Sequence, residues 1–265
     1  MSEDRVIIER DGAVAHVKLN RPDKRNGLDL EMFEGLIDAG TELSKDPTLR
    51  AVVLSGEGKA FCAGLDFMAF MAAADVGQKL LSRPEGSPAN LAQRAPWVWR
   101  EVPVPVIAAV HGYAFGGGLQ LALAADLRYV HPDAQMSVME IRYGLIPDMG
   151  ASQTLLGVVP LDVAKELTWT GRRVGAEEAM KLGLCTKITK DPVADALETA
   201  KLIAGQSPHA IRAGKQLFEK AAKMSVEDAF LYETELQLEL LGSKNQLEAV
   251  QASFTKRTPN FDDPA

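Results

Sequence analysis

Apolar and polar residues alternate near the start of the chain and then recur at helical spacing. Short apolar runs at residues 6–8 and 15–19 flank the turn pair Asp11-Gly12, which predicts a β-hairpin. Residues 29–44 carry apolar side chains at intervals of three and four, which predicts an amphipathic helix. The chain is therefore expected to begin with a hairpin followed by a helix.

Two continuous apolar runs, residues 51–54 and 106–110, predict buried strands. Each run is followed by a loop of small residues, and the second loop leads into a further helix. Repeated strand–loop–helix units predict a layered α/β fold.

The rest of the chain becomes progressively more helical. Residues 68–95 are less regular, and the breaker residues at 82–88 predict a surface loop or mobile lid. Further elements are predicted as strands at 126–130, 135–138 and 185–188, a helix at 176–182, and three or four helices over 191–254. The change to helices alone predicts a domain boundary near residues 190–205.

Charge and composition exclude several classes of protein. The chain of 265 residues has 29 basic and 36 acidic residues and a formal net charge of −7, which argues against nucleic acid as its main partner. We expect no membrane partner, because no apolar run approaches the roughly 20 residues that cross a bilayer. The charged amino-terminal segment does not resemble a signal peptide. The only two cysteines, Cys62 and Cys185, favour a reducing, cytoplasmic location.

The usual signatures of metal, nucleophile and phosphate-loop chemistry are absent from the sequence. Its four histidines lack metal-ligand spacing, so we expect no metal site. No Gly-x-Ser-x-Gly sequence occurs, and Gly116-Gly117-Gly118 lies in neither of the common phosphate-binding frames.

Two loops of small residues, at 60–66 and 115–119, are placed to expose backbone N–H groups. Residues without bulk let a ligand approach the main chain, and a helix amino terminus favours negative charge. Two such N–H donors aimed at one point would form an oxyanion hole. From these residues alone, however, glycines that merely permit tight turns are the favoured interpretation.

Three motifs resemble the crotonase (enoyl-CoA hydratase/isomerase) superfamily: residues 60–66 (AFCAGLD), residues 111–118 (HGYAFGGG) and residues 143–147 (YGLIP). The resemblance extends from Arg5 to Phe261 and is closest in motif to the dienoyl-CoA isomerase-like members. It implies an α/β fold, a crotonase-like spiral of ββα units, with an acyl-CoA-binding core at residues 1–200. It also implies a helical trimerisation region at 201–265, and hence a homotrimer or a dimer of trimers.

The resemblance also implies the ligand and the oxyanion hole. Members bind acyl-CoA thioesters, and no cofactor is expected because coenzyme A is part of the substrate. By position, the N–H groups of Leu65 and Gly117 would stabilise the enolate oxygen.

The acid and base positions divide the family. Hydratases carry two glutamates, at the positions of Gln120 and Glu140 here. Because an amide does not titrate, Gln120 is expected only to orient water or substrate, and Glu140 to carry the proton. Asp148 resembles an acid of dienoyl-CoA isomerases, and a helix cap is the alternative role for it.

Other residues are expected at the CoA and acyl sites by the same resemblance. Lys24 and Arg25 match a loop beside the CoA pyrophosphate and adenine, and Lys256 with Arg257 matches a basic pair that reaches the 3′-phosphate, sometimes from a neighbouring subunit. Solvated surface charge is an equally open interpretation of each. The substrate site is further predicted to include Ala63, Gly64, Asp66, Phe67, Met68 and Gly116. Aromatic and methionine side chains at Phe70, Met71, Trp97 and Trp99 are expected to line or cover the acyl pocket, with plain core packing as the alternative.

The sequence therefore predicts a cytoplasmic enzyme that shifts a double bond in an enoyl- or dienoyl-CoA through Glu140. Hydration of a 2-enoyl-CoA, with Asp148 as the second acid, is one alternative. A catalytically degenerate CoA-binding regulatory protein is another, and Gln120 is the feature that favours it.

Overall fold

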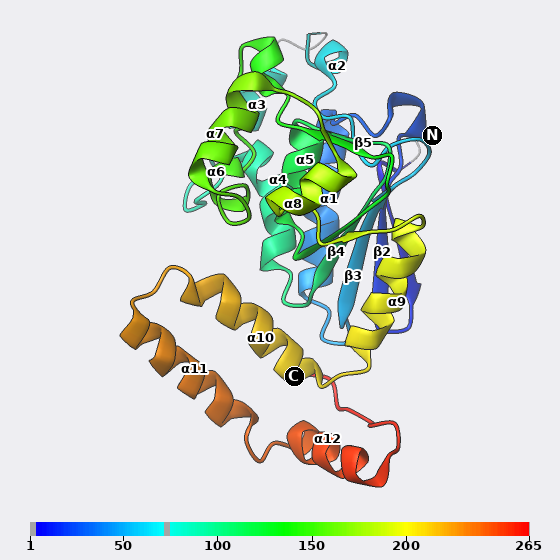
Figure 1. Cartoon of the computed structure of the whole chain (residues 1–265), viewed down its shortest axis with the longest axis vertical. Helices are drawn as coiled ribbons and strands as arrows, with labels where there is room; N and C mark the ends of the chain where they lie inside the picture. Colours follow the sequence, from blue (N-terminus) through cyan, green and yellow to red (C-terminus); the bar gives the residue numbers. More distant parts are fainter. Residues whose placement is uncertain (1–3, 72–74, 265) are drawn as a thin grey trace.

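Two β-sheets form the framework of the molecule, which is described here from a computed structural model covering residues 4–71 and 75–264 (Figure 1). The six-stranded sheet has the order β1-β2-β3-β4-β6-β9, and the three-stranded sheet has the order β5-β7-β8. The strands are β1 (Val6–Asp11), β2 (Val14–Leu19), β3 (Ala51–Gly56), β4 (Val106–Val110), β5 (Tyr113–Phe115), β6 (Leu127–Val130), β7 (Gln135–Ser137), β8 (Val174–Gly175) and β9 (Lys187–Ile188).

The predicted hairpin and buried strands are confirmed. Strands β1 and β2 pair antiparallel around Gly12, whose φ of +59° suits glycine in a tight turn. Strands β2, β3, β4, β6 and β9 all pair parallel. Because β3 and β4 lie at the centre of the sheet with both faces covered, their residues are almost wholly buried and their sequences are continuous apolar runs.

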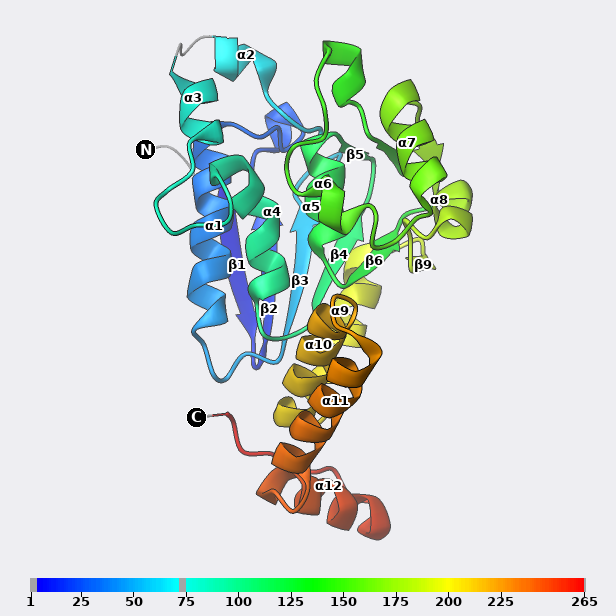
Figure 2. The same cartoon turned by 90° about the vertical axis from the view of Figure 1, so that its left-hand side faces the viewer.

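Helices cover both faces of the large sheet. They are α1 (Leu30–Ser44), α2 (Phe67–Met71), α3 (Val76–Leu81), α4 (Leu91–Glu101), α5 (Gly117–Ala124), α6 (Ala151–Thr154), α7 (Leu161–Thr170), α8 (Ala176–Leu182), α9 (Pro192–Ala204), α10 (Pro208–Ala221), α11 (Val226–Leu240) and α12 (Lys244–Thr255), with short 3-10 turns η1 (Pro22–Lys24) and η2 (Glu140–Tyr143). Helices α1, α4 and α5 cover one face, and α9 packs against the other (Figure 2). Of the two loops of small residues, the one at 60–66 leads directly into α2, and the one at 115–119 leads into α5.

The helix predicted at 29–44 is confirmed as α1. Asp29 caps it, accepting a hydrogen bond of 2.9 Å from the N–H of Met32. Its buried residues include Phe33, Leu36 and Leu43, the face that the spacing predicts.

The second sheet was not apparent from the sequence. Residues 113–115 lie in a predicted loop, yet they form β5, which pairs parallel with β7. The predicted strand 185–188 is reduced to the two residues of β9. The exposed surface loop predicted at 82–88 is confirmed, whereas α2 and α3 lie within the stretch described as irregular. Residues 72–74 of that stretch lie outside the described residues.

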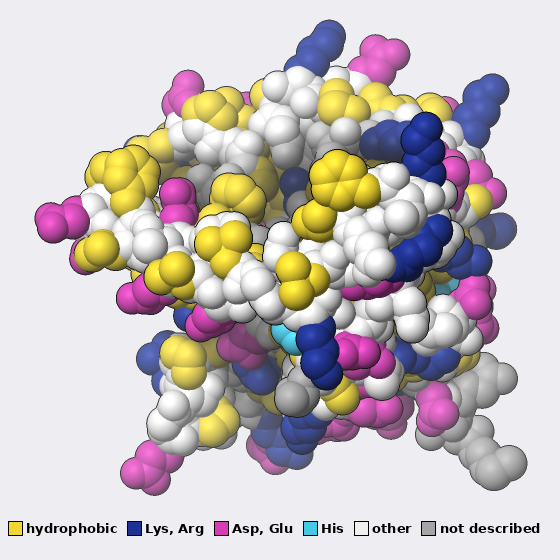
Figure 3. All heavy atoms as spheres, turned by 90° about the horizontal axis from the view of Figure 1, so that it is seen from below, with side chains coloured by type: hydrophobic (Ala, Val, Ile, Leu, Met, Phe, Trp, Pro, Cys, Tyr) yellow, Lys and Arg dark blue, Asp and Glu magenta, His cyan; other side chains and the backbone are white. Residues whose placement is uncertain are grey.

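Helices α10, α11 and α12, called here the C-terminal arm, extend away from the two sheets (Figures 1 and 2). Lys215 on α10 ties the arm to the core, because its Nζ lies 2.8 Å from Oδ2 of Asp126. Much of the arm's apolar surface is exposed, and Figure 3 shows hydrophobic side chains among charged ones on the end of the molecule where the arm lies. No helix in residues 4–71 and 75–264 is long and apolar enough to cross a membrane.

Candidate active site

The first small-residue loop is held by hydrogen bonds from both sides. Cys62 donates its N–H to the carbonyl of Tyr113 at 2.9 Å and accepts from the N–H of Phe115 at 3.1 Å. On the other side, the N–H of Leu28 donates to the carbonyl of Gly64 at 2.8 Å. These bonds fix the loop against β5, directly before the second small-residue loop.

The two loops approach each other most closely at Gly64. A Cβ there would lie 2.6 Å from the carbonyl oxygen of Phe115 and 3.6 Å from the nitrogen of Gly117, and φ is +87°. Only glycine combines this backbone conformation with this approach. The glycine therefore brings Leu65 and Gly117 to the same place.

The N–H groups of Leu65 and Gly117 are both free to bind a ligand. Within the described part of the chain, neither donates a hydrogen bond to another protein group. Gly117 is the first residue of α5, where the helix dipole favours negative charge. The pair therefore supplies two donors of the kind that an oxyanion hole requires.

Both residues line one cavity of about 280 Å³. Its walls are mainly apolar, and its carboxylates come from Glu140 and Asp148. The lining residues are Phe33, Ala63, Leu65, Phe67, Phe70, Gly77, Leu80, Leu81, Ala92, Gly117, Met139, Glu140, Tyr143, Leu145, Ile146, Asp148 and Met149. Such a cavity suits an apolar acyl chain with its polar end at the two N–H groups.

Glu140 starts the η2 turn that follows β7, so the small sheet positions it. Its Oε1 accepts a hydrogen bond of 2.7 Å from Nε2 of Gln120. Its Oε2 is buried and has no hydrogen-bond partner in the described part of the chain. Gly116 lies against the same carboxylate, since a Cβ there would lie 3.3 Å from Oε1. The carboxylate is thus held by one oxygen and left unsatisfied at the other.

Burial raises the pKa of Glu140 above its usual range, and the negative charge of Asp148 raises that pKa further. The hydrogen bond from Gln120 opposes this shift, because it favours the ionised carboxylate. Burial also raises the pKa of Asp148. Raised carboxyl pKa values in an apolar cavity are typical of proton-transfer sites.

Asp148 does not cap a helix. The following helix, α6, begins at Ala151, and its N-cap is Gly150, with no side-chain capping bond. The alternative role proposed for Asp148 from the sequence is therefore wrong, because the helix starts three residues after it. Asp148 instead lines the cavity together with Glu140, where a carboxylate is able to take part in the reaction.

Gln120 lies behind Glu140 rather than in the cavity. Its side chain is buried, and it is not among the described residues that line the cavity. This position differs from the expectation that Gln120 orients water or substrate, because its amide bonds to protein groups instead.

A second, open groove adjoins the cavity and contains several residues expected at the CoA site. Residues that line it are Arg21, Lys24, Gly27, Ala63, Gly64, Leu65, Asp66, Phe67, Met68 and Ala69. Asp66 is paired with Arg21 at 2.7 Å and caps α2 through the N–H groups of Met68 and Ala69. Arg25 lies nearby over the ring of Tyr113. Arg21 was not predicted as a site residue, although it belongs to the same basic segment as Lys24 and Arg25.

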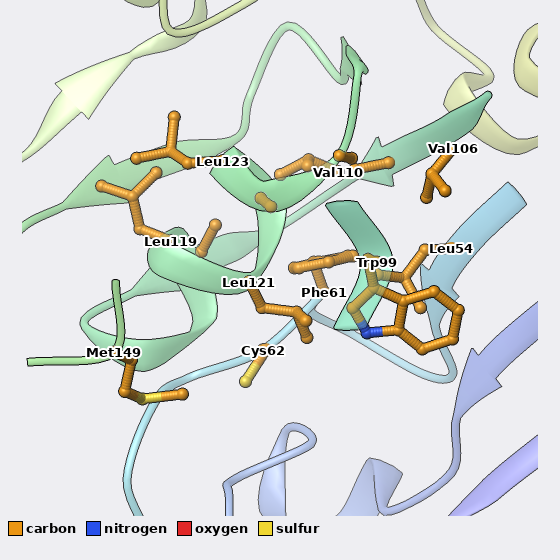
Figure 4. Packing of buried hydrophobic residues seen from close by; sticks show 14 of the residues in the cluster. Leu54, Phe61, Cys62, Trp99, Val106, Val110, Leu119, Leu121, Leu123 and Met149 are labelled. Carbon is orange, nitrogen blue, oxygen red and sulfur yellow. The ribbon is translucent and has the colours of Figure 1, made fainter. Parts of the chain in front are cut away.

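Other expected residues lie elsewhere. Trp99 is fully buried in the core with Leu54 and Phe61 (Figure 4), so the alternative of plain core packing is confirmed for it. Trp97 is not among the described residues that line the cavity. Met71 is largely exposed on α2. The structure brings Phe70 to the cavity, together with Tyr143, whose ring centroid lies 4.2 Å from that of Phe67.

Lys256 is not near the cavity of its own chain. It follows α12, at the end of the C-terminal arm far from α2 and α5 (Figure 1). The cavity is lined by residues of α2 and by Gly117 of α5. Arg257 pairs with Glu248 at 2.5 Å. A contact of Lys256 with ligand from a neighbouring subunit stays a prediction.

Known proteins resemble this chain along nearly all of its length. The family model described as enoyl-CoA hydratase/isomerase matches residues 9–264. A probable enoyl-CoA hydratase of Mycobacterium bovis is 33% identical over 265 residues, covering 98% of this chain and 99% of the relative. The mitochondrial Delta(3,5)-Delta(2,4)-dienoyl-CoA isomerase of Rattus norvegicus is 33% identical over 258 residues, covering 92% of this chain and 77% of that protein.

The fold is likewise shared with solved structures. The enoyl-CoA hydratase from Bacillus anthracis superposes with a TM-score of 0.89 at 30% identity, covering 97% of this chain and 98% of that one. The crotonase-like α/β fold expected from the motifs is confirmed. Relatives include mitochondrial and peroxisomal proteins, so the cytoplasmic location stays a prediction.

Proposed function

Because the chain belongs to the enoyl-CoA hydratase/isomerase family, we propose that it is an isomerase that moves a double bond in an enoyl- or dienoyl-CoA thioester. The observation that carries the proposal is Oε2 of Glu140, which has no partner among the described residues, on a side chain that lines the same cavity as Leu65 and Gly117. A buried carboxylate oxygen without a partner is costly, and a proton acceptor in a reaction explains why it is kept.

The chemistry follows from these three residues. The thioester oxygen accepts hydrogen bonds from the N–H groups of Leu65 and Gly117, which makes the α-proton acidic. Glu140 removes that proton, and the electron pair moves into the carbonyl to form an enolate oxygen. As the enolate collapses, Glu140 returns the proton to the far end of the conjugated system, and the double bond ends beside the carbonyl.

Hydration is the second candidate function, and Asp148 is the observation that favours it. Two carboxylates in one cavity are able to activate a water and deliver a proton. Hydratases are also among the similar proteins. The isomerase is preferred because the position of the first hydratase glutamate holds Gln120, which does not titrate.

Incubation with 2-enoyl-, 3-enoyl- and 3,5-dienoyl-CoA in deuterated water tests the proposal. We expect a shift of the double bond, visible in ultraviolet absorbance, with at most proton exchange detected by mass spectrometry. Addition of water without a shift would support the hydratase instead. Binding of acyl-CoA with no turnover of any of the three would support a regulatory CoA-binding protein.

A further inference from the structure

Both ends of the Gln120 amide are bonded to the active site. Nε2 donates to Oε1 of Glu140 at 2.7 Å, and Oε1 accepts from the N–H of Met149 at 2.8 Å. A carboxylate only accepts and a backbone N–H only donates, so the reversed amide would lose both bonds. The orientation of the amide is therefore fixed by its two partners.

Gln120 is also shielded from anything bound in the cavity. Its side chain is 3% exposed, and it comes from the first turns of α5, whose residues are all buried. Both amide atoms are bonded to protein groups, and burial keeps the remaining N–H of Nε2 away from water and substrate. Any effect of Gln120 on the reaction must pass through its two partners.

The two bonds act on the two carboxylates of the cavity. The bond to Glu140 holds Oε1 and leaves Oε2 as the carboxylate oxygen without a partner among the described residues. The bond to Met149 holds the residue that follows Asp148. One buried amide therefore sets the position of Glu140 relative to the Asp148 segment.

We propose that Gln120 is a positioning residue, which locks the Glu140 carboxylate with Oε2 toward the substrate and fastens the Asp148–Met149 segment to it. This inference rests on the proposed isomerase, in which Glu140 carries the proton. The position that supplies an acid in two-glutamate hydratases thus serves here to orient a single base.

The electrostatics of the contact agree with this role. Burial and Asp148 both raise the pKa of Glu140, and the bond from Gln120 lowers it. Since the reaction begins with ionised Glu140, the amide increases the fraction of carboxylate that is ready to react.

Gln120→Met tests the proposal, because methionine has a similar length and neither donates nor accepts strongly. We expect kcat to fall by about 10- to 100-fold, which is the size of loss that a misplaced reacting group causes. We expect little change in KM. The acidic limb of the kcat profile should move to higher pH. Leu121→Met is the matched control on the same helix, since Leu121 is buried in the core, and it should leave kcat and the pH profile unchanged.

The double variant separates positioning from general damage to the fold. If Gln120 acts through Glu140, Gln120→Met should hardly reduce the residual activity of Glu140→Gln further. An unchanged kcat and pH limb in Gln120→Met would overturn the proposal. The proposal would also be overturned if Gln120→Met reduced the activity of Glu140→Gln by the same factor as it reduces that of the unmodified protein.

A titration without turnover tests Gln120 separately from the proposed function. The Glu140 carboxyl can be followed by ¹³C nuclear magnetic resonance, with Glu140→Gln identifying its signal. We expect a higher pKa for Glu140 in Gln120→Met than in the unmodified protein, and an unchanged pKa would contradict the positioning role. If the unmodified protein isomerises no enoyl-CoA, the proposed function fails, whereas this titration still decides whether Gln120 controls Glu140.

Discussion

Asp148 lines the same cavity as Glu140, and its negative charge raises the pKa of Glu140 beyond the effect of burial. Two neighbouring carboxyl groups in an apolar site do not titrate independently, so one is held protonated more readily than the other. This relationship gives different expectations for the two side chains.

Glu140→Gln should remove most of the activity, because the amide neither takes nor returns a proton. Positioned acid–base groups typically contribute about 100- to 10,000-fold, and we expect a loss of kcat in that range. Steady-state assays with the best substrate of the panel would measure it. A folded variant that retains more than about a tenth of the activity would exclude Glu140 as the proton carrier.

Asp148→Asn decides whether the second carboxylate carries a proton or only tunes the first. If it only tunes Glu140, kcat should change mildly; if it is the second proton carrier, the loss should equal that of Glu140→Gln. Parallel assays on 3-enoyl- and 3,5-dienoyl-CoA would also show which substrate needs it. Enhanced activity at every pH would contradict both roles.

The pH dependence follows from the raised pKa of Glu140. The ionised form is active, so kcat should fall as the pH drops through a pKa above that of an ordinary glutamate. Removing the charge in Asp148→Asn should lower that pKa and move the acidic limb to lower pH. A profile of kcat against pH for both proteins measures this, and a shift of the limb in the opposite direction would refute the assignment.

The oxyanion hole should depend on main-chain atoms and hardly on side chains. Leu65→Ala keeps its N–H and should have little effect. Gly117→Pro removes a donor at the first position of α5, and its ring also displaces Met149, because a Cβ at position 117 would lie 2.6 Å from Sδ of Met149. Loss of one such donor typically costs about 100- to 1,000-fold in rate. Near-normal turnover by a folded Gly117→Pro protein, checked by circular dichroism, would rule out Gly117 as a donor.

The C-terminal arm should form an interface between subunits. Among the apolar residues of the arm, Leu236 is buried within the chain, whereas Phe230, Leu231 and Leu238 are more than half exposed. We expect a trimer or a dimer of trimers in sedimentation, and we expect Phe230→Asp to weaken it. A monomer at micromolar concentration would contradict this, and it would leave Lys256 without a route to bound CoA.

The sequence predicts the large sheet well because strands that are buried on both faces consist of continuous apolar residues. Strands β3 and β4 lie between helices on both faces, so their apolar runs are continuous. Strands of two or three residues such as β5 and β8 are too short to show a period, and their pairing depends on distant segments. The second sheet was therefore missed for a physical reason.

The candidate site could be predicted in part, from a resemblance and not from spacing. The motifs gave Leu65, Gly117, Glu140 and Asp148, which the structure brings to one cavity. The bonds of Gln120 were not predictable, because they depend on its rotamer and on the path of the chain at Met149.

The free donors at Leu65 and Gly117 belong to the peptide backbone, which every residue except proline supplies. Apart from glycines such as Gly64 that bring the two donors together, point substitutions therefore leave the donors in place, while they readily exchange the acids around them. Proteins with this fold can therefore evolve a different reaction outcome while they keep the two donors that stabilise an enolate. For the same reason, an inhibitor whose oxyanion mimic binds these two N–H groups would leave few single substitutions through which resistance could arise.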